Sequence, residues 1–454
     1  MQKIDHLKPY WTAYLNSQSR KTREGNSSNS SPELRTPFER DFDRALFSAP
    51  FRRLADKTQV FPLESLDAVH TRLTHSFEVS NIARSLGTAI VYNSDLKPFF
   101  EEISSTATRD IPSILATIGL IHDLGNPPFG HQGEKSIGLW FKKYFQQNND
   151  ISEEQKMDFE KFNGNAQTLR LITRLQILND NYGLNLTYGT LAAAIKYPSK
   201  VKKIGYFESE KHIIDEIWTN TGLRIDIRHP LTYLMEASDD IAYSVIDLED
   251  SVKKRLLSFS DIIAQLEAEN DPVIEKIIQQ SKSKYIEYSK EELNPHELND
   301  ISMQRFRTFV IAQMVSDVTQ TFLTNFEQLS TGQYCKSSLI EDSSSAKLCQ
   351  TLKNIATAFS YKHRSVKKLE LEGHNTILEL MDMLWPSINN PDSSSFNQFA
   401  YSTISENYKR VFADAIKSDT SDYAKYQLLS DMISGMTDNY CLNLHRELKA
   451  LYRE

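Results

Sequence analysis

The sequence predicts an all-α protein. Apolar residues recur at three- and four-residue spacings in most segments, whereas alternating, strand-like runs are few and short. Segments 112–125 and 231–254 have this helical spacing, and no repeat of fixed length is evident. In 301–323 the same spacing is kept by Met303, Phe306, Val310, Ile311, Met314, Val315, Val318 and Phe322. One small β-hairpin is expected near 200–211.

Composition limits the class of protein. The chain has 454 residues, of which 40% are hydrophobic and 25% charged, as in ordinary globular proteins. No apolar run approaches the ~20 residues needed to cross a bilayer, and the N-terminus lacks a secretory signal, so we expect a cytoplasmic protein without a membrane anchor. The cysteines Cys335, Cys349 and Cys441 lack Cys-x-x-Cys spacing, which argues against disulfides or a thiolate zinc site. With a net charge of −8, an anionic ligand needs a local basic pocket.

Three regions are expected along the chain. Residues 1–34 form an N-terminal segment, and its stretch 17–33, rich in Ser and Asn, is predicted to be flexible. Residues 35–260 hold the polar motifs described below and are expected to form the core that carries the chemistry. Residues 261–454 offer amphipathic helices without a comparable motif, so we expect them to complete the substrate site and supply an assembly surface.

The segment 119-GLIHDLGNPPFGHQGE-134 gathers titratable side chains around the end of a helix. The helical run 112–125 is ended by the Gly-Asn-Pro-Pro sequence at 125–128, because proline removes a backbone donor. Adjacent residues on a straight helix do not face each other, but His122 and Asp123 can converge on a shared ion at this end.

His131 and Glu134 follow the proline break at positions i and i+3. If a helix restarts here, the two side chains share a face, and the carboxylate can orient the imidazole for proton transfer. The alternative is a polar cluster at a helix N-terminus, with Glu134 stabilised by the helix dipole.

Two further segments place polar residues on helix faces. In 72–86, His75 shares a stripe with Val79 and Ile82 and faces the interior, although a lone core histidine more often bonds to a carbonyl. In 231–254 a second stripe, at i, i+4 and i+8, consists of Asp239, Tyr243 and Asp247. Partly buried acids without partners are costly, so a cation or hydrogen-bond donors must meet this stripe.

Two histidines and two aspartates from three helices make a candidate metal site: His75, His122, Asp123 and Asp239. Imidazole with carboxylate suits manganese, iron, nickel, cobalt or zinc better than calcium. The absence of thiolates argues against structural zinc.

Six segments resemble the bacterial deoxyguanosine triphosphate triphosphohydrolases of the HD-domain superfamily, which also includes the vertebrate sterile-alpha-motif/HD triphosphohydrolase. The segments are 52-RRLADKTQVFP-62, 71-TRLTHSFEVSNIARSLG-87, 121-IHDLGNPPFGHQGE-134, 162-FNGNAQTLR-170, 235-MEASDDIAYSVIDLED-250 and 433-ISGMTDNY-440. The matches run from about Arg35 to Tyr440, and the combination HDLGNPPFGHQGE with DDIAYSVIDLED is highly specific.

The resemblance implies a helical HD fold that binds a divalent metal through His75, His122, Asp123 and Asp239. We expect Mn²⁺ or Mg²⁺ ahead of Fe, Co, Ni or Zn. Asp239 is preferred to Asp240 because Tyr243 and Asp247 continue its face.

The implied reaction is hydrolysis of a deoxynucleoside triphosphate to the deoxynucleoside and inorganic triphosphate, with water attacking the α-phosphorus. His131, positioned by Glu134, matches the family's catalytic histidine and acid. Gln59 and Asp247 match residues that contact the deoxyribose 3′ hydroxyl. Tyr243 would pack under the sugar and exclude a 2′ hydroxyl.

Positive groups must offset the roughly four negative charges of a triphosphate. Arg72 and Lys203 are candidates, and Lys196-Tyr197 matches a Lys-Tyr pair of the family. Lys200 and Lys202 are instead expected to be solvated surface residues.

The resemblance also implies a homo-oligomer, a tetramer or a hexamer, and a nucleotide or single-stranded DNA effector. Bacterial members usually have arginine where this chain has His70, a difference that bears on nucleotide or effector contacts. Two alternatives remain open: an HD phosphohydrolase acting on other nucleotides, and a nucleotide-sensing or nucleic-acid-binding regulator with a vestigial metal site.

Overall fold

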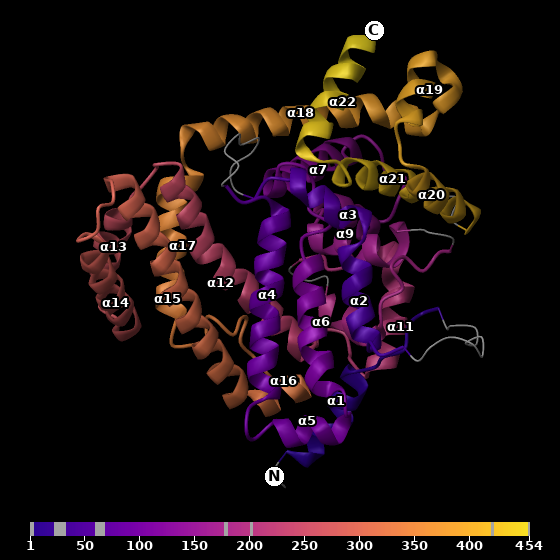
Figure 1. The fold of residues 1–454 in the computed structure, drawn as a ribbon. Helices are drawn as coiled ribbons and strands as arrows, with labels where there is room; N and C mark the ends of the chain where they lie inside the picture. The colour runs from indigo at the N-terminus through magenta and orange to yellow at the C-terminus, as the bar shows by residue number, and fades with distance from the viewer. Residues whose placement is uncertain are drawn as a thin grey trace.

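The computed structural model describes residues 4–21, 33–59, 69–176, 180–199, 203–418 and 422–452. These residues form 22 α-helices and no β-strand, which confirms the all-α prediction (Figure 1). The α-helices are α1 (Lys8–Tyr14), α2 (Pro37–Leu46), α3 (Ala49–Arg53), α4 (Arg72–Val91), α5 (Lys97–Ile103), α6 (Ala107–Ile121), α7 (Gly130–Phe145), α8 (Glu153–Glu160), α9 (Gly164–Arg170), α10 (Tyr188–Ala194), α11 (Lys211–Thr221), α12 (Pro230–Lys253), α13 (Phe259–Glu267), α14 (Pro272–Tyr288), α15 (Pro295–Thr324), α16 (Phe326–Thr331), α17 (Ala346–Ala356), α18 (Arg364–Asn389), α19 (Ser395–Ser402), α20 (Glu406–Ser418), α21 (Tyr423–Ser434) and α22 (Asp438–Leu451).

Helices α4 and α6 pack side by side at the centre of the molecule, and α2 and α12 flank them (Figure 1). The close approach depends on Gly119, because a Cβ there would lie 2.8 Å from the Cα of Ser80. Val79 and Ile82 are buried on the α4 face that also carries His75, as the sequence predicts. This packing brings His75 next to His122, which follows the last residue of α6.

Helices α15 and α17 pack against α12. The apolar face predicted for 301–323 is confirmed, since six of its eight residues are buried and Ile311 and Val315 are partly buried; the six are Met303, Phe306, Val310, Met314, Val318 and Phe322. The second half of the chain therefore supports the helix that carries Asp239. One hydrophobic core runs from Leu7 to Leu448, and the domain boundary at residue 260 stays a prediction.

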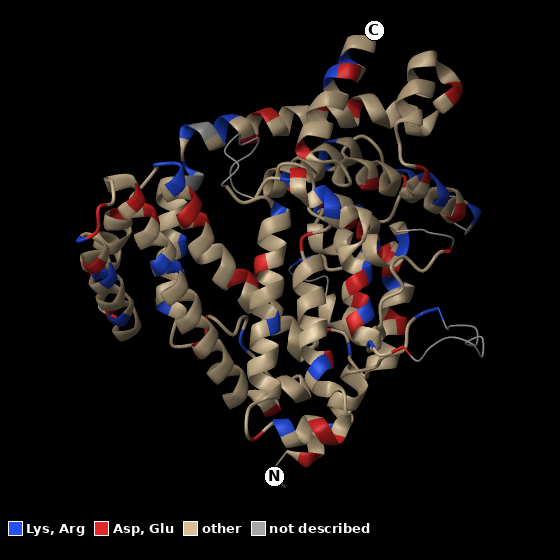
Figure 2. Ribbon diagram, in the orientation of Figure 1, with Lys and Arg blue, Asp and Glu red and all other residues tan. Residues whose placement is uncertain are grey.

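Helix α18 crosses the end of this core and packs against α7, α21 and α22 (Figure 1). Figure 2 shows acidic and basic residues interspersed along the helices. Cys335, Cys349 and Cys441 are free thiols. Within the described ranges, no helix is both long enough and apolar enough to cross a membrane.

The prediction of a β-hairpin near 200–211 is wrong for residues 203–211, the part that the structure describes. Residues 203–207 form bends, and a 3₁₀-helix (Glu208–Glu210) leads directly into α11. A Cβ at Gly205 would lie 1.9 Å from the carbonyl oxygen of Tyr197, so the chain folds tightly over Tyr197 and forms no ladder there. Residues 200–202, including Lys200 and Lys202, lie outside the described residues.

The segment 17–33, predicted to be flexible, is attached to the core over residues 17–21. Ser19 forms a bridge with Thr187, and the Arg20 guanidinium bonds to the Glu216 carboxylate at 3.1 Å. Polar composition alone did not reveal these partners. Residues 22–32 lie outside the described residues.

Candidate active site and metal centre

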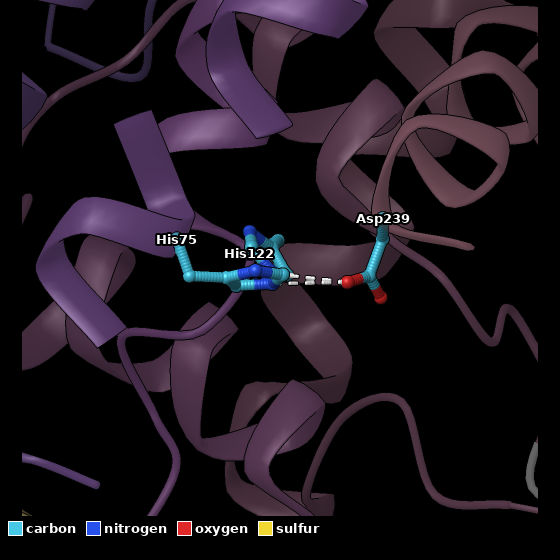
Figure 3. Close-up of side chains that lie close together, drawn as sticks. All are labelled: His75, His122 and Asp239. Carbon is cyan, nitrogen blue, oxygen red and sulfur yellow. Dashed lines mark hydrogen bonds and ion pairs between the residues drawn. The ribbon is translucent and has the colours of Figure 1, made fainter. Parts of the chain in front are cut away.

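Three predicted ligands converge from three helices (Figure 3). His75 belongs to α4, His122 follows α6, and Asp239 belongs to α12. The Oδ1 atom of Asp239 lies 3.2 Å from Nε2 of His75 and 3.6 Å from Nε2 of His122. The three ligand atoms all lie within 4.8 Å of one another, so one ion could contact all three.

The protonation pattern of His122 fits a metal ligand. Its Nδ1 lies 2.7 Å from the carbonyl oxygen of Gly119, which can only accept, so Nδ1 carries the proton. The lone pair of Nε2 therefore faces the cluster, and this buried atom has no hydrogen-bond partner among the described residues. An imidazole whose other nitrogen is fixed by a carbonyl is the usual arrangement at a metal. Two imidazoles and a carboxylate suit a divalent transition metal.

Asp123, the fourth predicted ligand, lies beside the group of three. Its Oδ1 is 3.5 Å from Nε2 of His122 and accepts a hydrogen bond from Asn126 Nδ2 at 2.6 Å. Its Oδ2 accepts from the guanidinium of Arg72. Burial would raise the pKa of Asp123, but the positive charge of Arg72 helps to hold it below its ordinary value. Asp123 is thus an ionised carboxylate at the edge of the cluster.

Lys196 provides a cation at the cluster. Its Nζ lies 3.8 Å from Oδ2 of Asp239 and 3.7 Å from Oε1 of Glu236. Burial would lower the pKa of Lys196, but these two carboxylates raise it above its ordinary value, so the ammonium stays charged. The polar partners required at the Asp239 stripe are therefore present.

Tyr197 extends this positive region. Lys203 Nζ donates to the Tyr197 hydroxyl at 3.1 Å. The charged groups of Lys203, Arg228 and Lys196 lie 5.0, 5.8 and 5.9 Å from the centre of the Tyr197 ring, which is within cation–π range. Arg228 also bonds to Glu236 at 2.7 Å. Neither Arg228 nor Glu236 was predicted from the sequence.

The proton-transfer pair stands at the start of α7. Phe129 and Gly130 have φ values of 60° and 57°, and this left-handed turn starts the new helix. Glycine suits position 130 because φ there is left-handed, and a Cβ would also lie 2.6 Å from Nη2 of Arg72. His131 Nδ1 lies 2.9 Å from Oε2 of Glu134, and Gly164 N–H donates to Oε1 of Glu134 at 2.7 Å. The His131 side chain is 86% exposed, so its other nitrogen faces open space.

Three residues, Gln59, Tyr243 and Asp247, are predicted to contact the sugar, and the structure gives their burial without testing that role. Asp247 is buried. Burial would lower the pKa of His75, but Asp239, Asp123 and Asp247 raise it above its ordinary value. Gln59 is partly buried, and its Oε1 has no hydrogen-bond partner in the described part of the chain. Tyr243 is partly exposed between Asp239 and Asp247 on α12. Their roles stay predictions.

Comparison with known proteins identifies the fold. An HD domain matches residues 72–195, and a phosphohydrolase-associated domain matches residues 342–447. A deoxyguanosinetriphosphate triphosphohydrolase-like protein of Listeria monocytogenes is 36% identical, over 97% of this chain and 99% of that protein. The chain belongs to this family. A like-named protein of Synechocystis is 32% identical over 92% of the chain, and a deoxyguanosinetriphosphate triphosphohydrolase of Salmonella paratyphi A is 30% identical over 92%.

In this member of the family, the phosphohydrolase-associated region contacts the turn before His131. Oδ1 of Asp438 accepts from the Phe129 N–H at 3.0 Å, and Oδ2 accepts from the Thr58 N–H at 3.0 Å. Asp438 is buried. One carboxylate therefore links the left-handed turn to Thr58, the residue before Gln59.

Lys57 makes a second link that the sequence did not predict. Its buried ammonium donates to the carbonyl oxygens of Asn126 and Ser434, at 2.5 and 2.8 Å. Burial lowers the pKa of Lys57 to about 7. The Lys57 carbonyl in turn accepts from the Arg72 N–H at 3.1 Å. Nothing in the sequence around Lys57-Thr58 or Thr437-Asp438 indicates that these two segments lie in contact.

Proposed function

We propose that the chain is a metal-dependent deoxynucleoside triphosphate triphosphohydrolase, which releases the deoxynucleoside and inorganic triphosphate. The observation that carries the proposal is the cluster of His75, His122 and Asp239, in which the buried Nε2 of His122 has no hydrogen-bond partner among the described residues. The ammonium of Lys196 lies beside it. The names of the relatives support the same reaction.

His75, His122 and Asp239 would hold the divalent metal, with Asp123 at its edge. The ion would supply positive charge to phosphate oxygens and lower the pKa of a water molecule. A triphosphate carries roughly four negative charges, and the chain offers Arg72, Lys196 and Lys203 to offset them. Arg72 and Lys196 are buried or partly buried, where charge pairs are stronger than in bulk water, whereas Lys203 is exposed.

His131 would give a proton to the 5′ oxygen as it leaves the α-phosphorus. The Glu134 carboxylate holds Nδ1 of His131 at 2.9 Å, which leaves Nε2 as the atom that transfers the proton. The Gly164 N–H fixes the second oxygen of Glu134, so the carboxylate cannot rotate away. General acid catalysis of this kind contributes about a hundredfold or more.

Gln59 and Asp247 would bind the 3′ hydroxyl of the deoxyribose, and Tyr243 would pack under the sugar. The unpartnered Oε1 of Gln59 supports this role, because a hydroxyl donor would satisfy it. A 2′ hydroxyl would meet the Tyr243 ring. The proposal therefore includes discrimination against ribonucleotides.

The test is an assay of the purified protein with Mn²⁺ and each deoxynucleoside triphosphate, resolving products by ion-exchange chromatography. Triphosphate with free deoxynucleoside is the expected result, and the fastest substrate names the base preference. Monophosphate with pyrophosphate would keep the metal site but overturn the position of attack. No turnover with any nucleotide, alone or mixed, would overturn the proposal in favour of a regulatory protein.

A further inference from the structure

A groove of 420 Å³ lies beside the Glu134 carboxylate. Helix α7, the end of α8 and residues 203–204 form its walls. Four lysines line it, namely Lys135, Lys142, Lys161 and Lys203, and all four are exposed. Lys135 and Lys142 are seven residues apart on α7 and so share one face of that helix.

Most of this positive charge is not neutralised locally. Lys135, Lys142 and Lys161 make no ion pair with any described residue. Two acids, Glu134 and Glu160, also line the groove. Glu134 already accepts hydrogen bonds through both oxygens, from His131 and from the Gly164 backbone. In a chain of net charge −8, this is a local basic surface.

Lys203 connects the groove to the metal cluster through Tyr197 and Lys196. Lys203 lines the groove and donates to the Tyr197 hydroxyl at 3.1 Å. Lys196 lies 5.9 Å from the centre of the same ring, and its Nζ is 3.8 Å from Asp239. A series of cationic groups therefore leads from Asp239 to the surface.

We infer that this groove is a second binding site for linear polyphosphate, occupied by the inorganic triphosphate that the reaction releases. The inference rests on the proposed function for its natural ligand. Several ammonium groups that line one groove suit a chain of phosphates, each lysine acting as a point charge. A single-stranded nucleic acid would also need aromatic side chains on which bases stack. The aromatic residue of the lining, Phe162, is instead buried in the core.

The test is a charge-reversal double variant, Lys142→Glu with Lys161→Glu. Both side chains are exposed and lie outside the proposed catalytic and substrate-binding residues, so the fold and the rate of turnover should be retained. The matched control is Lys143→Glu, which reverses an exposed neighbour on α7 that does not line the groove. Binding of inorganic tripolyphosphate to the full chain is measured by calorimetry at low salt, with inhibition of turnover measured in parallel.

We expect tripolyphosphate to bind the double variant about tenfold more weakly than the parent, while the control matches the parent. The inhibition constant of tripolyphosphate should rise by the same factor. Equal affinity in all three proteins would overturn the inference, and so would a single-stranded oligonucleotide that binds the groove more tightly than tripolyphosphate. Calorimetry measures binding without turnover. If the parent protein were inactive but the double variant still bound tripolyphosphate more weakly, the binding site in the groove would stand and only the proposed reaction would be rejected.

Discussion

Two buried charged clusters in this protein differ in how completely their polar atoms are paired. In the first, Arg170 donates through Nε and Nη2 to Asp431 and through Nη1 to Glu210, at distances of 2.7 to 3.1 Å. In the second, His75 and His122 meet Asp239 at 3.2 and 3.6 Å. All three side chains of the Arg170 cluster are buried, whereas the Asp239 side chain is 26% exposed.

The two clusters differ in whether their charged groups leave polar atoms without a hydrogen-bond partner. Every carboxylate-facing donor of Arg170 has an acceptor, so the opposite charges of that cluster satisfy one another. In the other cluster, Nε2 of His122, Nδ1 of His75 and Nε of Arg72 are buried without a hydrogen-bond partner among the described residues. Buried polar atoms are seldom left unpaired in native proteins unless a ligand, ion or catalytic role accounts for them. We therefore treat the Arg170 cluster as structural and the His122 cluster as functional.

The largest effect is expected on removal of the carboxylate shared by the functional cluster. Asp239→Ala should abolish metal binding and reduce turnover by about a thousandfold or more, because no other described side chain contacts both histidines. Metal content after dialysis and the rate of hydrolysis measure this. The matched control is Asp240→Asn, because Asp240 pairs with Lys353 at 2.6 Å. If the control lost metal and Asp239→Ala kept it, the ligand would be Asp240.

Arg170→Met should have the opposite pattern. It leaves Asp431 and Glu210 buried without their cation, which costs about 3–5 kcal/mol in the free energy of unfolding. Metal affinity of the folded protein should not change. Urea denaturation and metal titration measure the two quantities. Arg174→Met is the control, because Arg174 makes no ion pair with the described residues and should cost little. A loss of metal affinity in Arg170→Met would contradict the division into two kinds of cluster.

The sequence predicted the local parts of the site. The i, i+3 spacing of His131 and Glu134 is enough to bring them together once a helix restarts after the proline break, and the structure has this helix. Helical spacing also predicted that His75 faces the interior. A periodic stripe shows which residues share a face, because that depends only on the geometry of one helix.

The sequence did not predict contacts between distant segments from spacing alone. Asp438 bonds to Thr58 and Phe129, which are 380 and 309 residues away, and each of these residues taken alone is an ordinary polar or apolar position. Glu236 lies one turn before Asp239, but its partner Lys196 comes from the segment after α10. Such contacts depend on how helices pack, and many different packings bury the same stripes.

A smaller effect is expected at the proton-transfer pair. His131→Ala should keep the bound metal and lower the rate of turnover by about a hundredfold, because only the proton donor is removed. The rate constant and the metal content of the same preparation measure this. Gln132→Ala, at the neighbouring partly buried position, is the control and should stay near the parental rate. A normal rate in His131→Ala would leave the metal cluster intact but reject His131 as the acid.

The smallest effect is expected at His70, a charged group near the metal cluster whose polar atoms are fully paired. His70 Nδ1 lies 2.7 Å from Oδ1 of Asp250, and Nε2 lies 3.2 Å from Oε1 of Glu78, so both ring nitrogens are paired. Burial would lower the pKa of His70, but the two carboxylates raise it to about 10, from an ordinary value of 6.5. By its pairing, His70 belongs with the structural cluster.

Because the folded pKa of His70 lies above the unfolded value, its contribution to stability is complete below pH 6.5 and is lost as the pH rises towards 10. His70→Gln should therefore lower the free energy of unfolding by about 1.5–3 kcal/mol at pH 6, and the difference should shrink as the pH rises to 10. Urea denaturation at several pH values measures this, with the exposed His212→Gln as control. Metal affinity should stay unchanged. If His70→Gln altered metal affinity and left stability alone, complete pairing would no longer identify a structural cluster in this protein.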